Sequence, residues 1–275
     1  MNTKRLAVLA AVGRNLILAL WAVFALFPIL WMVLCTFKLD REMYSTTFLF
    51  HPTLENYTNV LVRTDYFKAF FDNIIVSGGS VILSVLVGVP AAYGFARYNF
   101  KSREFWAGQI LGFKFAPEIL VVLPLFMIYQ KLHLIDTYFG LIWVYQLITM
   151  PFLIWVVRGY FEDISLEVEQ AAQLDGYSWY QVFLKILLPL IKPGLVAAAL
   201  LTFIFAWNSF MFPLILSGFS VQTVTVSSLK YLASDTVHYG QMAVAATITV
   251  LPEVIMALII QKHLVRGLSF GAVKG

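Results

Sequence analysis

Long apolar stretches separated by short polar segments dominate this chain. A helix needs about 20 mostly apolar residues to cross a bilayer core about 30 Å thick. Six stretches meet that length, over residues 15–37, 73–98, 106–131, 138–161, 193–217 and 239–263. The pattern therefore predicts an all-α membrane protein with six transmembrane helices in a single transmembrane domain over residues 1–275.

Composition supports a lipid environment. The 275 residues are 60% apolar and 12% charged, whereas soluble domains have about 45–50% apolar and about 25% charged residues. So little polar surface excludes an ordinary soluble enzyme, a nucleic-acid-binding domain and a disordered chain. Cys35 is the only cysteine, which excludes an internal disulfide. The first stretch is too long for a signal-peptide core and is interpreted as an uncleaved anchor.

The distribution of Lys and Arg predicts the orientation. Most of them lie in four segments, namely the N-terminal tail, the loops after residues 98 and 161, and the C-terminal end. Six crossings place these four segments on one side, and basic loops favour the cytoplasm. We therefore expect both termini in the cytoplasm. The outer loop over residues 38–72 is mixed in charge and is expected to form a small cap.

The cytoplasmic loop over residues 162–192 has the pattern of a helix–turn–helix. Ser165 can cap a short helix, and Gly176 follows its end, where a left-handed residue is often needed. Ser178 and Gln181 have the spacing of a capping box that starts a second helix.

The composition of this hairpin suits contact with a soluble partner. Its first helix carries Glu167 and Glu169 near its positive end and is small-surfaced at Ala171 and Ala172. Pro189 is expected to break or kink the second helix before the next span. The alternative is an interfacial amphipathic hairpin that has no partner.

A specific run of residues identifies this loop further. It is Glu169-Gln-Ala-Ala-Gln-Leu-Asp-Gly-Tyr-Ser, followed by Phe183, Ile186, Leu188-Pro189-Leu190 and Pro193. The run resembles the EAA loop of ABC-importer permeases, although Gln170 replaces the usual Glu and Tyr177 the usual Ala. The resemblance implies that this coupling loop contacts an ATPase through Glu167, Glu169, Gln170, Ala171, Ala172, Asp175 and Gly176.

Further segments are similar to the permeases of carbohydrate importers of the maltose and trehalose type. They cover residues 116–126, 131–138, 205–214 and 266–275. The resemblance implies a subunit of a binding-protein-dependent, ATP-driven sugar importer in a bacterial or archaeal inner membrane. Its implied partners are a second permease subunit in a heterodimer, two ATP-binding subunits and an extracytoplasmic solute-binding protein. The loop over residues 217–239 resembles the outer loop that reaches toward that binding protein.

The resemblance implies a non-catalytic subunit that holds no cofactor. The chain lacks a Gly-x-x-x-x-Gly-Lys-Ser/Thr phosphate loop, so ATP and Mg are expected on the partner ATPase. Three alternatives remain. They are an importer permease for a non-sugar solute, an ion-driven secondary transporter and an intramembrane enzyme. No clear internal repeat supports the secondary transporter. The histidines are dispersed along the sequence and form no cluster that would support the enzyme.

Aromatic and hydrogen-bonding residues inside two spans are candidates for the sugar pathway. They are Trp143, Gln146, Thr149, Trp207, Asn208 and Ser209. For Asn208, a contact between helices is an equally open interpretation, because an amide in hydrocarbon needs a partner. For the two tryptophans, helix contacts or an interfacial belt are the alternatives.

Three charged residues lie inside predicted spans, namely Lys114, Glu118 and Glu253. Lys114 and Glu118 are four residues apart, so on a continuous helix they would share a face and pair. Pro117 and Pro252 adjoin the two glutamates, which favours a structural or gating role at helix breaks. A proton pathway and a substrate contact are left open.

Overall fold

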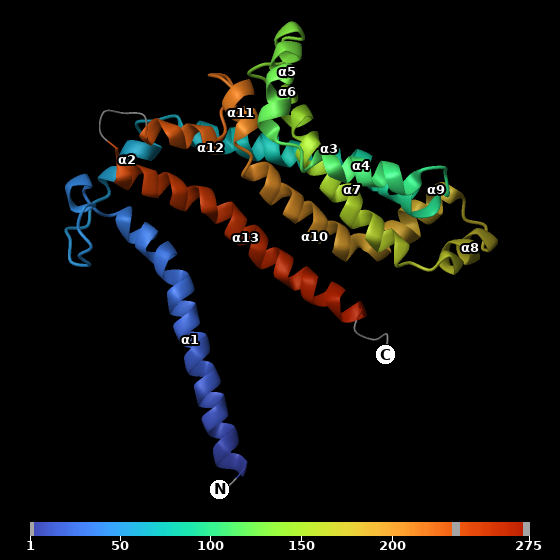
Figure 1. Cartoon of the computed structure of the whole chain (residues 1–275), viewed down its shortest axis with the longest axis horizontal. Helices are drawn as coiled ribbons and strands as arrows, with labels where there is room; N and C mark the ends of the chain where they lie inside the picture. The colour runs from blue at the N-terminus through green and yellow to red at the C-terminus, as the bar shows by residue number, and fades with distance from the viewer. Residues whose placement is uncertain (1–2, 233–236, 272–275) are drawn as a thin grey trace. The chain divides into compact units, whose positions relative to one another are not determined.

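The computed structural model describes the backbone of residues 3–232 and 237–271, and the side chains of residues 11–232 and 237–261. Every regular element in this part of the chain is helical (Figure 1). Three parts of the sequence predictions fall outside the described side chains. They are the basic residues before residue 11, residues 233–236 of the loop over 217–239, and the C-terminal run over 266–275.

The contacts divide the chain into two units. One comprises Met1–Tyr66 and Ser228–Thr249, and the other comprises Phe67–Ser227 and Val250–Gly275. The first unit holds α1 (Thr3–Cys35), η1 (Asp40–Glu42), α2 (Glu55–Leu61), η3 (Ser228–Tyr231) and the first third of α13 (Tyr239–Gly271). The second holds most of α3 (Tyr66–Arg97), the helices from α4 to α12 (Val224–Ser227), and the rest of α13.

Within the described residues, four helices are long and apolar enough to cross a membrane. These segments are Ala11–Cys35, Tyr66–Arg97, Trp179–Trp207 and Tyr239–Gln261. Two bent pairs raise the number to six if each pair is one span. The first pair is α4 (Arg103–Phe113) with α5 (Glu118–Lys131), and the second is α6 (Tyr138–Val144) with α7 (Gln146–Glu162).

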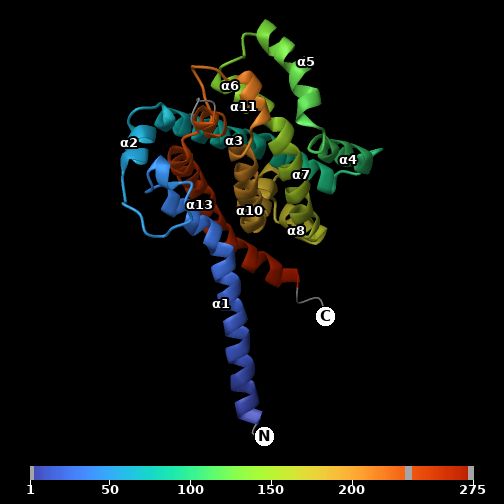
Figure 2. The ribbon, with the colours of Figure 1, turned by 60° about the vertical axis from the view of Figure 1, so that its left-hand side comes forward.

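The stretch predicted as one helix over 106–131 is broken. The axes of α4 and α5 differ by 86°, and both views show α5 turning away from α4 (Figure 1, Figure 2). Pro117 explains the break, because proline disfavours helical backbone in the residue before it and lacks an N–H for the preceding turn.

The stretch over 138–161 bends by 45° at Tyr145. Two side chains compete for backbone carbonyls there. Gln146 Nε2 donates to Ile142 O at 2.9 Å, and Thr149 Oγ1 donates to Tyr145 O at 2.9 Å. Such back-bonding from a polar side chain to the preceding turn often bends a helix.

The helix predicted over 193–217 has different bounds. In the structure α10 (Leu188–Trp207) ends earlier, and α11 (Met211–Leu216) follows after a break. The ring of Pro213 would clash with the carbonyl of Ser209 in a continuous helix. That carbonyl instead accepts a hydrogen bond from Thr225 Oγ1 at 2.9 Å, which stabilises the break.

Pro189 does not interrupt the helix that precedes it. The elements α9 (Trp179–Val182), η2 (Phe183–Leu187) and α10 join into one segment over Trp179–Trp207, so the break, one of the two outcomes predicted at Pro189, does not occur. The element η2 is a turn of π-helix in which Leu188 N donates to Phe183 O. This wider turn relieves the contact between the proline ring and the preceding carbonyls, so the helix continues.

Two apolar clusters form the core of the second unit. One joins α3, α7, η2 and α10 around Leu153, Phe161 and Leu187. The other joins α5, α6 and α11 around Val122, Leu141 and Leu216. Helices α7 and α10 lie side by side (Figure 1). The core of this unit therefore consists of apolar contacts between neighbouring helices.

In the first unit, the outer loop is held by a buried lysine. Lys38 Nζ donates to Thr47 O at 2.8 Å and lies 4.3 Å from the centre of the Trp31 ring. Asn56 Nδ2 donates to the carbonyl oxygens of Thr36 and Lys38 at 3.0 and 2.8 Å. Polar contacts of this kind, rather than a large apolar core, order this loop.

Candidate functional site

The polar hairpin between α7 and α10 is built from local capping interactions. Helix α8 (Leu166–Leu174) begins at Ser165, whose Oγ accepts from Glu167 N at 3.3 Å. Gly176 follows the helix with a φ of +88°, a left-handed conformation that glycine adopts without strain. Ser178 and Gln181 exchange hydrogen bonds as a capping box at the start of α9. These three sequence predictions are confirmed.

Glu169 ties this hairpin to the end of α3. Its carboxylate accepts a hydrogen bond from Tyr93 Oη at 2.8 Å and forms an ion pair with Arg97 Nε. Arg97 Nη2 also donates to Ile164 O, just before α8, at 2.8 Å. Glu169 is only 7% exposed, and burial strengthens such an ion pair but makes a lone charge costly.

Aromatic rings surround Tyr93 at the same junction. Its ring centre lies 5.4 Å from that of Phe161 in α7, 6.0 Å from Trp179 in α9 and 5.3 Å from Phe183 in η2. Edge-to-face contacts, as with Phe161 and Phe183, are attractive at these separations, and the Trp179 ring is tilted against Tyr93. Both arms of the hairpin therefore contact one side chain of α3.

The opposite side of the hairpin is exposed and partly apolar. The large exposed apolar residues of the hairpin are Leu166, Val168, Leu174, Tyr177, Trp179 and Tyr180, and Trp179 also contacts the Tyr93 ring. Leu174 is 89% exposed, the most of this group. We call these six residues the outer hairpin face. Large exposed apolar side chains gathered in one short segment favour an interaction site.

The seven residues predicted to couple to an ATPase divide between these two sides. Glu167, Gln170, Ala171, Asp175 and Gly176 are exposed. Glu169 and Ala172 are instead buried against the chain's own core. Ala172 is therefore covered by this chain's own residues in this structure. The coupling role of the seven residues stays a prediction.

The candidate pathway residues of α6 and α7 form a hydrogen-bonded contact with α3. Ser84 Oγ lies 2.7 Å from both Gln146 Oε1 and Thr149 Oγ1. Gln146 Nε2 also donates to Ser80 O at 3.1 Å. Gln146 and Thr149 therefore hold helices together here. Trp143 is exposed and is not part of this contact.

The remaining pathway candidates surround the break between α10 and α11. Trp207 is buried, its ring centre 5.7 Å from that of Phe203, and its carbonyl accepts from Asn73 Nδ2 at 3.2 Å. Asn208 is exposed, and Glu253 of α13 is hydrogen-bonded to it. Ser209 is buried. The structure thus brings the carboxyl group of Glu253 to Asn208, a predicted pathway residue, and the sequence does not reveal this contact.

Lys114 and Glu118 do not form the predicted ion pair. The break at Pro117 places them on helices of different direction. Lys114 Nζ instead lies 3.3 Å from the ring centre of Phe205 and 4.4 Å from that of Phe152. Among the described residues its ammonium has no hydrogen-bond partner. Its environment is a pair of ring faces, a known setting for cations.

Two aspartates hold the start of the loop after α11. Asp136 accepts from Ser220 N at 2.9 Å and from Val221 N at 2.8 Å. Burial alone would raise the pKa of Asp136, but these hydrogen bonds lower it below its usual value. Asp72 accepts from Gln222 N at 3.0 Å and from Tyr138 Oη at 2.6 Å.

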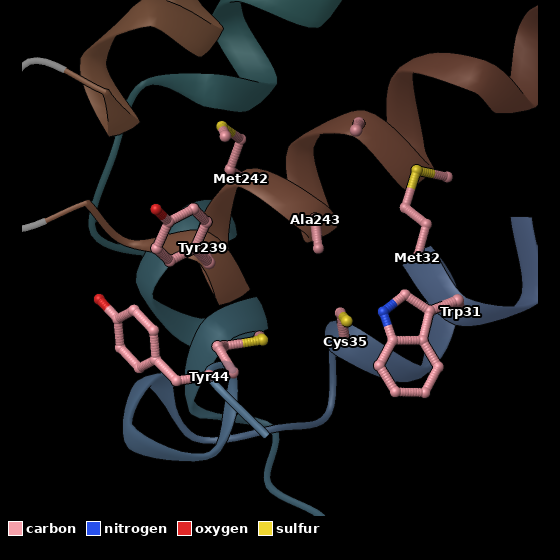
Figure 3. Close-up of a pocket in the computed structure, with 9 residues that line it drawn as sticks. Trp31, Met32, Cys35, Tyr44, Tyr239, Met242 and Ala243 are labelled. Carbon is pink, nitrogen blue, oxygen red and sulfur yellow. The ribbon is translucent and has the colours of Figure 1, made fainter. Parts of the chain in front are cut away.

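A separate pocket lies within the first unit, with a volume of about 420 Å³. Figure 3 shows Cys35 and Met32 of α1 and Tyr239 and Met242 of α13 around it. Its lining is mainly sulfur, aliphatic and aromatic groups, with few hydrogen-bonding atoms. This chemistry does not suit a sugar, so the pocket adds no pathway residue.

Sequence reasoning missed several residues that hold these sites. Tyr93 and Arg97 anchor the hairpin, and Asn73 contacts the break after α10. Ser77 and Asn73 are completely buried one helical turn apart on α3, and one side-chain oxygen of each lacks a partner among the described residues. The signal was the spacing of Asn73, Ser77, Ser80 and Ser84 along one face of an apolar helix.

Apolar helices of spanning length joined by a polar hairpin define a multi-pass membrane protein. The chain belongs to the family of binding-protein-dependent transport system inner membrane components, which its residues 84–270 match. It is therefore a membrane permease component rather than a catalytic subunit.

Relatives support this membership, and a solved structure shares the fold. The trehalose/maltose transport system permease protein MalG of Thermococcus litoralis is 36% identical, over 93% of this chain and 94% of that protein. The trehalose transport system permease protein SugB of Mycobacterium tuberculosis is 32% identical, over 92% and 93%. A bacterial ABC transporter that imports the acidic polysaccharide alginate has a chain of similar fold, with a TM-score of 0.76, 22% identity, and 95% and 98% coverage.

Proposed function

We propose that this chain is one of two permease subunits of an ATP-driven importer of sugars in a bacterial or archaeal inner membrane. The observation that supports it most is the full-length similarity to permeases of trehalose and maltose transport systems. In this proposal, each bent helix pair is one span, which gives six crossings and places both termini in the cytoplasm. An extracytoplasmic protein delivers the sugar.

The hairpin of α8 and α9 is the proposed contact with the ATPase, which binds the ATP and Mg. The outer hairpin face supports this assignment, since exposed apolar side chains such as Leu174 gain most from a protein partner. Glu167, Gln170 and Asp175 supply polar groups on the same exposed side.

The proposed sugar pathway passes the break between α10 and α11. Asn208 is exposed there and is joined by Glu253. A sugar hydroxyl can both donate to and accept from such a pair of polar groups. Gln146, Thr149 and the buried Trp207 have mainly intramolecular contacts in this structure, so we place them behind the pathway rather than on it.

The function is tested first by its partners and then by uptake. The tagged chain is purified from its native membrane in mild detergent, and co-purifying proteins are identified by mass spectrometry. We expect a second permease and a protein with an ATP phosphate loop. Recovery of the chain alone, under conditions that preserve other membrane complexes, would contradict the proposal.

The complex is then reconstituted in vesicles with the binding protein, and uptake of labelled trehalose and maltose is measured with and without ATP. ATP-dependent sugar uptake supports the proposal. ATP-dependent uptake restricted to a non-sugar solute would change the substrate class. Uptake that needs an ion gradient and no ATP would instead establish a secondary transporter.

The hairpin contact is tested with a matched pair of variants. Leu174→Asp places a charge on the outer hairpin face, and Leu49→Asp does so at an equally exposed leucine of the outer loop. We expect Leu174→Asp to lose the ATPase on purification and Leu49→Asp to retain it. Equal retention by both variants would refute the hairpin contact.

A further inference from the structure

The inner side of α8 is attached to α3 by an unusually complete polar contact. Both carboxylate oxygens of Glu169 are used, one by Tyr93 Oη at 2.8 Å and the other by Arg97 Nε. Arg97 then reaches back to Ile164 O at 2.8 Å. One arginine therefore contacts both the start and the middle of the same short segment.

This contact differs from the apolar contacts around it in how it responds to displacement. Apolar side chains can slide past one another with little loss, because dispersion contacts are individually weak and non-directional. Separating Glu169 from Arg97 would instead leave two charges that are both largely excluded from water. A displacement of α8 therefore moves the end of α3 along with it.

Helix α3 also reaches the proposed pathway. About three and a half turns from Arg97, Ser84 contacts Gln146 and Thr149 at the bend of α6 and α7. Nearer its other end, Asn73 donates to Trp207 O beside the break after α10. A continuous helix thus joins the hairpin anchor to the groups that surround the pathway.

We infer that Glu169 is a positioning residue that couples α8 to α3 rather than a contact to the ATPase. Docking of α8 on the ATPase moves Glu169, and through Arg97 and Tyr93 this motion reaches α3 and the pathway. The inference rests on the proposed function, because it assumes that the outer hairpin face binds the ATPase.

The test uses the assembled complex with Glu169→Gln. Glutamine keeps the shape and an oxygen that accepts from Tyr93, but it removes the charge that pairs with Arg97. Glu55→Gln is the matched control, since it makes the same change at an exposed glutamate of α2, outside the hairpin. The readout is the number of ATP molecules hydrolysed per sugar imported, alongside retention of the ATPase on purification.

We expect Glu169→Gln to retain the ATPase and its basal hydrolysis while the ATP used per sugar rises at least threefold. Glu55→Gln should match the unaltered complex. Arg97→Gln should raise the ratio to a similar extent, and the double variant should be no worse than either single one, because both remove the same ion pair.

Two results would overturn the inference. An unchanged ratio in Glu169→Gln would show that the ion pair transmits nothing, and loss of the ATPase from that complex would show that Glu169 only maintains the hairpin. The proposed function fails in a different way, namely when the unaltered complex imports no sugar with ATP, and the inference then falls with it.

Discussion

Replacing Gly194 by alanine should disturb the contact between α7 and α10. A Cβ atom built at Gly194 would lie 2.4 Å from Cζ of Tyr160 and 2.5 Å from its Cε1 and Cε2. Nonbonded carbon atoms normally lie about 3.5–4.0 Å apart, so the ring or a helix must move by about 1 Å. Overpacking of this kind costs about 1–3 kcal/mol.

Gly159→Ala provides the matched control on α7. No heavy atom lies within 4 Å of its built Cβ, so alanine there meets open space. Both substitutions gain helix propensity, worth up to about 1 kcal/mol. The difference in stability between the two variants therefore isolates the clash with Tyr160, and we expect it to be about 1–3 kcal/mol.

The assay heats the purified complex in detergent and measures the fraction that remains monodisperse on size exclusion. Each kcal/mol shifts the midpoint of a domain of 150–250 residues by about 2–4 °C, so Gly194→Ala should fall several degrees below Gly159→Ala. Adding Tyr160→Ala should shrink the effect of Gly194→Ala, because the clashing ring is gone. Equal midpoints for the two glycine variants would refute the reasoning.

Further predictions concern the hairpin, the loop after α11 and Lys114. Gly176→Ala should destabilise the turn by about 1–2 kcal/mol, because the φ of Gly176 is +88°, and faster proteolysis at the turn would show it. Gly176→Pro should still insert in the membrane but lose ATP-driven transport. Normal transport by that variant would contradict a coupling hairpin. Asp136→Asn should speed hydrogen exchange at the Ser220 and Val221 amides. Because the pKa of Asp136 is lowered, protection of these amides in the unaltered chain is complete above pH about 4 and is lost as the pH falls through that lowered pKa. The variant should lack this pH dependence. Lys114→Met should raise the unfolding midpoint, since its buried ammonium lacks a hydrogen-bond partner in the described part of the chain; a lower midpoint would show that the ring faces more than offset desolvation.

Local features of the hairpin could be predicted from the sequence because their causes lie within a few residues. Ser165 caps the helix that follows it directly, and Ser178 bonds with Gln181 three residues later. Gly176 occupies a left-handed position that few other residues accept. Each of these interactions is encoded by its own short segment and does not depend on the rest of the fold.

The helix breaks could not be predicted in the same way. Proline within a membrane helix can be accommodated when neighbouring groups satisfy the freed backbone. Pro189 is tolerated because η2 widens into a π turn before it. Pro213 stands beyond a full break, where Thr225 donates to the carbonyl of Ser209. The outcome depends on a partner in another segment, which the residues beside the proline do not specify.

The faces of α8 invert the usual relation between polarity and burial. Leu174 is 89% exposed, whereas Glu169 is 7% exposed. Sequence alone places acids outward, because an unpaired buried carboxylate is costly. Here Arg97, which lies 72 residues earlier in the chain, makes burial of Glu169 possible. With the charge satisfied internally, the helix leaves its apolar side chains free on the opposite face. Exposing these apolar side chains costs some free energy, and contact with a protein partner would remove that cost.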